Sequence, residues 1–264
     1  MAANKLAEEK NLKVSVGLQR HHQAGYLGTI DAIKEGKLDE PYLLRVYWNG
    51  HGIWNRARKP NQTELEYQVM NWYHYIWLSG DNICEQHVHN LDIGNWIMSA
   101  HLKKEGAEWA HPIEANGMGA NLTRGYNGKD IQGQLFDAEF IEYSYENGTR
   151  MYSQCRHQPS TWSNVSEWVH TAKNAKGLNC GSGGEAPKLQ HSNPYVQEHY
   201  DLQLAIKEDK KQNEGWYGAI SSMTAVLGRT AVYSGQVIKW DDLIAKGEDT
   251  FPTEISTWNS KPPV

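Results

Sequence analysis

The sequence contains little cysteine and lacks any long hydrophobic run. Its 264 residues include three cysteines, Cys84, Cys155 and Cys180, and no Cys-x-x-Cys pair. Cysteines this few and this scattered do not form the disulfide framework of a small secreted domain. No apolar stretch reaches the roughly 18 residues that a membrane-spanning helix needs. These absences exclude a disulfide-stabilised scaffold and predict that the chain has no membrane partner.

The usual motifs for phosphate and dinucleotide binding are also missing. A Gly-Ser-Gly-Gly run at residues 181–184 neither follows a predicted strand nor opens a helix in the required register. The glycines of residues 116–120 lack a strand–turn–helix context as well, and no Walker or Gly-x-Ser-x-Gly sequence occurs. We therefore expect no complete dinucleotide site on this chain.

Positive charge and phenylalanine are likewise scarce. Lys and Arg number 26 against 31 Asp and Glu, which gives a net charge of −5 and argues against a nucleic-acid partner. Phe occurs 3 times, against 11 Trp and 14 Tyr. Aromatic residues with a polar group suit half-wet clefts and sugar-stacking platforms, although a Trp-rich core is the alternative. Residues 1–10 form a charged helix and not a signal peptide, which predicts a cytoplasmic location, or a periplasmic one if an upstream signal was lost.

Hydrophobic periodicity and turn residues predict an α+β domain. Helices are expected at residues 2–10, 26–35, 82–102, 195–208 and 214–234, with a short last turn at 240–246. Strands are expected at residues 13–18, 41–49, 111–121, 135–145, 148–156 and 163–171. This order indicates an open, mostly antiparallel sheet with helices on one face. The other face would then be covered in a homodimer or higher oligomer.

Two segments are expected to lack regular structure. Residues 50–80 are polar and rich in aromatic side chains. A loop of this length in a compact domain is usually functional or disordered, and its aromatic content opposes disorder. We therefore predict that residues 50–80 pack over a site. Residues 175–192 are rich in Gly, Ser and Lys and are predicted to form an exposed loop.

Residues 84–96 carry the clearest candidate chemistry. In one continuous helix, Glu85, His89 and Asp92 lie at i, i+4 and i+7 and share a face. A histidine that a carboxylate orients is the usual general base near neutral pH. The spacing alone also fits a surface helix with a polar face.

Several motifs resemble the glucose–fructose oxidoreductase/inositol dehydrogenase/MocA family, in the family's order and at about its spacing. They are residues 14–20, Glu85-x-x-x-His89-x-x-Asp92, His111-Pro112 before a strand, and Asn-Pro-Tyr-Val-Gln-Glu-His at residues 193–199. Residues 80–92 also resemble a subgroup with the stretch Gly-Asp-x-Ile-x-Glu-Gln-His-x-His-Asn-Leu-Asp. The resemblance covers essentially the whole chain.

The resemblance implies two structural parts. Family members have an N-terminal Rossmann domain that binds NAD or NADP, followed by an α/β domain whose open sheet supports substrate binding and oligomerisation. Residues 1–19 resemble the last helix and strand of the first part, and residues 20–264 resemble the second. The Gly-rich turn and the Glu-Lys-Pro segment of the family have no counterpart here. We therefore expect no NAD or NADP binding by this chain alone.

The resemblance also implies an active site. In the family an Asp-x-x-x-His pair lies beside the substrate, with the histidine as base for the hydroxyl being oxidised. His89 matches the histidine and Glu85 the aspartate, although Glu85 is one methylene longer. Arg20 falls where members carry a basic residue that reaches the active site. Further predicted sugar contacts are Asp92, His87, Tyr47, Trp54, Arg56, Tyr67 and Trp72.

Three functions fit these residues. The first is a sugar-active oxidoreductase domain that acts on a sugar or glycoside, with His89 and Glu85 as acid–base pair. The second is NAD-independent hydrolysis or elimination on a glycoside or keto-sugar. A divalent metal could assist it, with His22, His51 or His74 as extra ligands, although His87 and His89 diverge on a helix and oppose one shared ion. The third is a non-catalytic sugar-binding or oligomerisation module. A truncated gene product belongs to this third alternative.

Overall fold

The computed structural model describes residues 1–122, 133–247 and 254–263. Its centre is a seven-stranded sheet in the order β6-β5-β1-β4-β3-β2-β7. The strands are β1 (Pro41–Gly50), β2 (Glu114–Ala120), β3 (Ala138–Ser144), β4 (Arg150–His157), β5 (Asn164–Thr171), β6 (Leu178–Asn179) and β7 (Ile238–Lys239). Strands β1 and β4 are parallel, and the other neighbours are antiparallel. The predicted open, mostly antiparallel sheet is confirmed.

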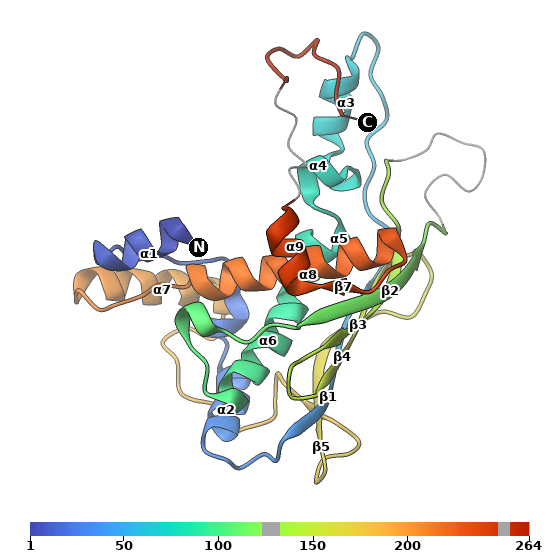
Figure 1. Cartoon of the computed structure of the whole chain (residues 1–264). Helices are drawn as coiled ribbons and strands as arrows, with labels where there is room; N and C mark the ends of the chain where they lie inside the picture. The colour runs from blue at the N-terminus through green and yellow to red at the C-terminus, as the bar shows by residue number, and fades with distance from the viewer. Residues whose placement is uncertain (123–132, 248–253, 264) are drawn as a thin grey trace.

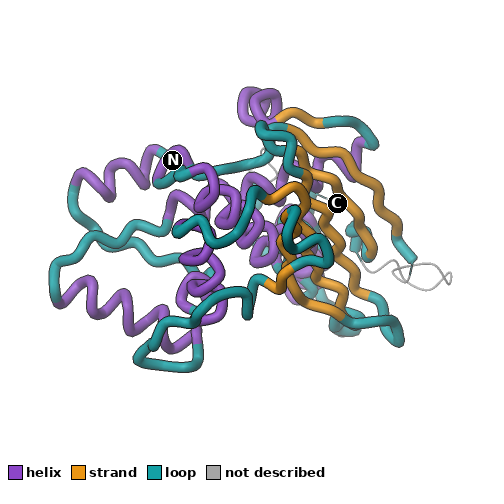
Figure 2. Tube along the Cα trace, turned by 90° about the horizontal axis from the view of Figure 1, so that it is seen from below, coloured by secondary structure: helices purple, strands orange, loops and turns teal. Residues whose placement is uncertain are grey.

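The described helices are α1 (Ala2–Glu9), η1 (Gln19–His22), α2 (Ala24–Lys34), α3 (Glu64–Met70), η2 (Trp72–His74), α4 (Ile76–Ser79), α5 (Asn82–Glu85), α6 (Val88–Leu102), η3 (Gly106–Glu108), α7 (Pro194–Lys207), α8 (Gly215–Ser234) and α9 (Trp240–Lys246). Of these, α6 and α8 lie against one side of the sheet (Figures 1 and 2). Helix α6 packs on β1 and β5, and α8 packs on α6, β2 and β3. In the described ranges, each helix is too short or too polar to cross a lipid bilayer.

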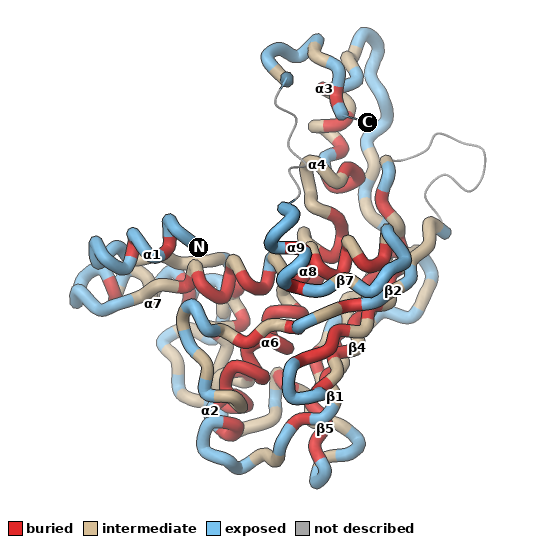
Figure 3. The backbone as a smooth tube through the Cα atoms, in the orientation of Figure 1, coloured by how far each residue is buried: buried red, intermediate tan, exposed pale blue. Residues whose placement is uncertain are grey.

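The core lies between the sheet and the helices α6 and α8 (Figure 3). In α6 every residue from Asn90 to Ala100 is buried, because the helix has the sheet on one side and α2 and α8 on others. A Cβ at Gly94 would overlap the sulfur of Met151 on β4. The absent side chain therefore lets α6 lie close to the sheet.

The predicted continuous helix over residues 82–102 is wrong in one respect. The chain leaves helical hydrogen bonding after Glu85 and starts α6 at Val88. Between them the side chain of His87 turns into the core, where its Nε2 is 2.6 Å from Ser153 Oγ and its Nδ1 is 3.2 Å from Asn90 Oδ1. These contacts with β4 redirect the backbone, so Glu85 and His89 do not sit on successive turns of one helix.

Three other predictions also need correction. Residues 13–18 form an isolated bridge, Val14 with Asn213, in place of a strand. Residues 50–80 contain α3, η2 and α4, which project from the body of the fold (Figure 1). Helix α3 starts there with a capping box between Thr63 and Glu66. Residues 175–192 include β6 and the buried Cys180, whose carbonyl accepts a hydrogen bond from Thr29 on α2, so part of this segment is packed and not exposed.

Candidate functional site

The short helix η1 contacts four parts of the fold through three consecutive side chains, Arg20, His21 and His22. Arg20 forms a buried ion pair with Glu167 on β5, with 2.8 Å between Nη1 and Oε1. His21 contacts α6, as described below. His22 lies between Asp201 on α7, at 2.7 Å, and Glu214 next to α8, at 3.1 Å. Three consecutive basic side chains thus face acids on separate elements.

His21 is held between two aromatic rings. It stacks on Trp96 and on Tyr217, each at a centroid distance of 3.9 Å. Its Nε2 is 2.7 Å from Oδ2 of Asp92, whose Oδ1 accepts a hydrogen bond of 2.8 Å from Ser221. Both oxygens of the fully buried Asp92 therefore have protein partners.

His89 lies in the first turn of α6 and faces Trp48 of β1, with 6.2 Å between ring centroids. The alternation of side chains along a strand explains this pairing. Leu44, Val46 and Trp48 point toward the helices, and Leu44 and Val46 are fully buried. His89 is thus positioned by a helix start on one side and a sheet residue on the other.

Burial and charge keep His89 neutral near pH 7. Desolvation, and then the positive charge of Arg20, lower the His89 pKa to about 4, against a smaller opposite effect of Asp92. Desolvation raises the pKa of Glu85, and the Tyr73 hydroxyl partly offsets this. A neutral imidazole can accept a proton, which is the first requirement of a general base.

Among the described residues, two polar atoms of this pair find no hydrogen-bond partner although they are buried. They are Nδ1 of His89 and Oε2 of Glu85. Within the described ranges, no hydrogen bond joins Glu85 to His89, so the predicted orienting contact is absent. Buried polar atoms in folded proteins are usually paired, and each exception calls for an explanation such as a ligand.

Three other predicted polar contacts, Arg20, His87 and Asp92, are buried and have protein partners. Arg20 is engaged by Glu167 and lies 5.8 Å from the ring centroid of Tyr26. His87 and Asp92 are both fully buried and hydrogen-bonded. The structure therefore places these three side chains where they can support and polarise the site, while direct contact with a sugar stays a prediction.

The predicted wall residues fall into two groups. Tyr47 points to the sheet face opposite His89, where Arg45 lies 5.9 Å from its ring centroid. Trp54, Arg56 and Trp72 lie together in the projecting segment around η2. Tyr67 lies in the same segment, with the guanidinium of Arg58 4.0 Å from its ring centroid.

Sequence reasoning missed Trp48 and Tyr73 as neighbours of the candidate pair. Trp48 has a signal in the sequence, because period-two alternation from Leu44 and Val46 places it on the buried face. Tyr73, which interacts with Glu85, comes from η2 and has no such local signal. Among the residues described, no three His, Cys, Asp or Glu side chains are arranged to hold a metal ion.

Comparisons with known proteins find similarity in structure. No protein-family model matches the sequence, and no curated protein matches it either. Myo-inositol 2-dehydrogenase from Lactobacillus plantarum matches with a TM-score of 0.63 and 14% identity, over 90% of this chain and 68% of that one. Scyllo-inositol dehydrogenase from Lactobacillus casei, solved with NAD(H) and scyllo-inositol, gives 0.62 and 15% over 89% and 67%.

A third solved structure, the aldose–aldose oxidoreductase of Caulobacter crescentus in complex with glycerol, matches with a TM-score of 0.56 and 12% identity. The match covers 88% of this chain and 65% of the oxidoreductase. Identities this low establish the fold and no more. The described part of the chain has the fold shared by inositol dehydrogenases and related sugar oxidoreductases.

Proposed function

We propose that this chain is the polyol-binding domain of a sugar or cyclitol oxidoreductase of the glucose–fructose oxidoreductase/inositol dehydrogenase/MocA family. One observation carries the proposal. On a fold shared with inositol dehydrogenases, His89 and Glu85 each keep a buried polar atom that has no partner in the part of the chain that the structure describes. A ligand hydroxyl, which both donates and accepts, satisfies atoms of this kind.

His89 is the general base in this proposal. It is neutral, and a hydroxyl placed against its ring can transfer a proton to the free nitrogen. In this proposal Glu85 accepts a hydrogen bond from a neighbouring hydroxyl. Trp48, which faces His89, is the apolar surface for the ring of the polyol. The charges of Arg20 and Asp92 act on the pKa of His89: Arg20 lowers it and Asp92 raises it.

The described residues do not fit a nicotinamide dinucleotide by themselves. In the ranges that the structure covers, no glycine-rich turn leads from a strand into a helix, which a pyrophosphate site requires. The proposal therefore extends to the polyol and its proton only. We further propose that this chain alone does not bind NAD or NADP.

Calorimetric titration with myo-inositol, scyllo-inositol and methyl glucoside tests the proposal. We expect at least one to bind, and His89→Ala to weaken that binding by roughly tenfold or more. Binding should also weaken as the pH falls toward 4 and His89 becomes charged. His199→Ala, an exposed histidine on α7, is the matched control and should bind like the wild type.

The outcomes separate the three functions. Failure of every polyol to bind at millimolar concentration contradicts the proposal. Cleavage of a glycoside that a chelator abolishes would instead support a metal-assisted hydrolase or lyase. Unchanged binding in His89→Ala would support a non-catalytic binding module.

A further inference from the structure

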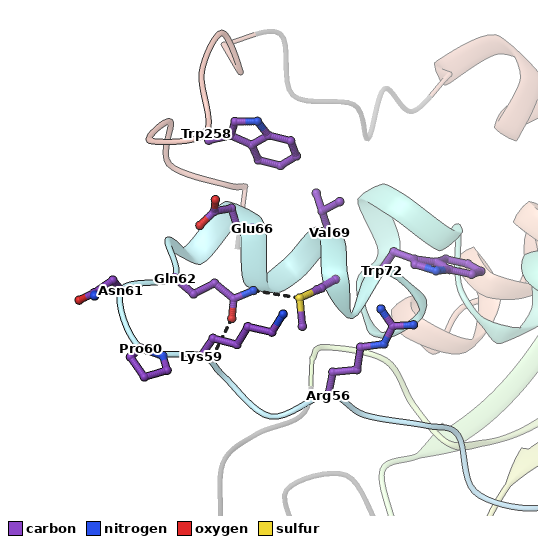
Figure 4. Close-up of a pocket in the computed structure, with 10 residues that line it drawn as sticks. Arg56, Lys59, Pro60, Asn61, Gln62, Glu66, Val69, Trp72 and Trp258 are labelled. Carbon is purple, nitrogen blue, oxygen red and sulfur yellow. Dashed lines mark hydrogen bonds between the residues drawn. The ribbon is translucent and has the colours of Figure 1, made fainter.

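A cavity lies in the projecting segment, and its lining does not include His89. It has a volume of about 640 Å³ and lies between α3, the chain before α3 and the C-terminal tail (Figure 4). Arg56, Lys59, Met70, Trp72 and Trp258 are among its lining residues. Pockets of roughly 300–1,000 Å³ are the size that binds small organic ligands.

The lining of this cavity contains two cations and one carboxylate. In the described part of the chain, neither Arg56 nor Lys59 makes an ion pair, whereas the neighbouring Arg58 pairs with Glu64. Glu66 also lines the cavity, but its carboxylate accepts a hydrogen bond from the backbone N–H of Thr63 at the start of α3. Two cations are therefore available to a ligand.

The same cavity exposes two indole rings. Trp72 is 38% exposed and Trp258 58% exposed, although large aromatic side chains usually bury most of their surface. The hydroxyl of Thr63 donates a hydrogen bond of 2.8 Å to the carbonyl of Trp258, which fixes the tail beside α3. Residues almost 200 positions apart thus build one cavity.

We propose that this cavity binds a saccharide unit that carries a carboxylate. The faces of sugar rings are apolar and pack on indole, while a guanidinium binds a carboxylate through two parallel hydrogen bonds. A simple inorganic anion does not need the tryptophans, and a neutral sugar does not need two cations. The side chain of Arg56 extends toward Trp72 (Figure 4), and such a ligand would lie beside these two residues and Lys59.

The cavity and the His89 site are neighbours through η2. Trp72 lines the cavity, and the next residue, Tyr73, interacts with Glu85. An acidic oligosaccharide with one unit at His89 would therefore extend toward Arg56 and Lys59. This connection rests on the proposed function, whereas binding in the cavity itself does not.

Titration with digalacturonate tests the inference, with cellobiose and sodium sulfate as neutral and inorganic comparisons. We expect digalacturonate to bind, and the double variant Arg56→Gln/Lys59→Gln to weaken binding by roughly tenfold or more, because charge-assisted hydrogen bonds are lost. Trp258→Ala should weaken it severalfold. Arg58→Gln removes a cation of the same segment that is already paired, and it should leave the affinity unchanged.

Three results would overturn the inference: no binding of digalacturonate, equal binding of cellobiose, or equal binding of sulfate. Unchanged affinity in the folded double variant would also overturn it. Arg56 and Lys59 are exposed, so their replacement leaves the core intact, and a thermal melt verifies folding. His89→Ala separates the two proposals, since it should weaken polyol binding by roughly tenfold or more and leave the binding of digalacturonate in the cavity unchanged.

Discussion

At the scale of single residues, His22 and Glu214 form a pair that links η1 to the start of α8. Burial lowers the pKa of His22, but hydrogen bonds with Glu214 and Asp201 outweigh it, so the net pKa is raised. Burial raises the pKa of Glu214, but His22 and hydrogen bonds from Val16 and Ser15 lower it to about 2. Each partner thus stabilises the charged form of the other.

The pair predicts a specific pH dependence of stability. The pKa of Glu214 is lower in the folded chain than its usual 4.5, so its contribution is present above pH 4.5 and is lost as the pH falls toward 2. Glu214→Gln should therefore cost on the order of 3 kcal/mol at neutral pH. Urea unfolding at several pH values checks this, and a difference that persists unchanged in acid would contradict it.

Glu208→Gln is the matched control for that experiment. Glu208 pairs with Lys210 on the surface, and exposed ion pairs contribute little to stability. A similar loss in both variants would show that the effect is a general change of net charge.

Residue roles could be predicted from the sequence only where local spacing determines them. His87 and His89 are two positions apart, yet one is fully buried against Ser153 and the other faces Trp48. Both positions are histidines, so residue type does not distinguish them. The difference arises from contacts with β4 and β1, which residue spacing along the chain does not encode.

At the scale of elements, helices could be predicted better than their interruptions. The apolar pattern of α8 gave its bounds to within a residue. The break between α5 and α6 depends on tertiary hydrogen bonds of His87, and the helical pattern continues through it. The bridge of Val14 likewise depends on a partner, Asn213, that lies far along the chain.

Helix α8 also gives a packing prediction. A Cβ at Gly228 would overlap the hydroxyl of the fully buried Tyr143 on β3. Alanine favours helix by about 0.5–1 kcal/mol over glycine, but overpacking costs about 1–3 kcal/mol. Gly228→Ala should therefore destabilise the fold, as thermal or urea unfolding would show.

Tyr143→Phe supplies the control for this prediction. The Tyr143 hydroxyl has no hydrogen-bond partner in the described ranges, so its removal should cost little and make room for the new methyl group. The double variant should recover part of the stability that Gly228→Ala loses. Simple additivity of the two changes would contradict a steric cause.

At the scale of the whole molecule, the fold class could be predicted because strand alternation and helix periodicity are local properties. The projecting segment could not be predicted, because its aromatic content indicates packing but does not identify the surface against which it packs. The cavity beside α3 depends on Trp258, which meets Thr63 only in the folded chain. The domain boundary at residue 19 stays a prediction.

The open face of the sheet predicts self-association. Tyr47, Phe140, Tyr152 and Trp168 alternate with buried residues and point away from the helices, and Met118 beside them is 71% exposed. An aromatic surface of this kind favours burial against a second copy. We expect light scattering to show an oligomer for the wild type, and Met118→Lys to shift it to smaller species. Ile244→Lys, a similar change on the exposed side of α9, should not, and a monomeric wild type would contradict the prediction.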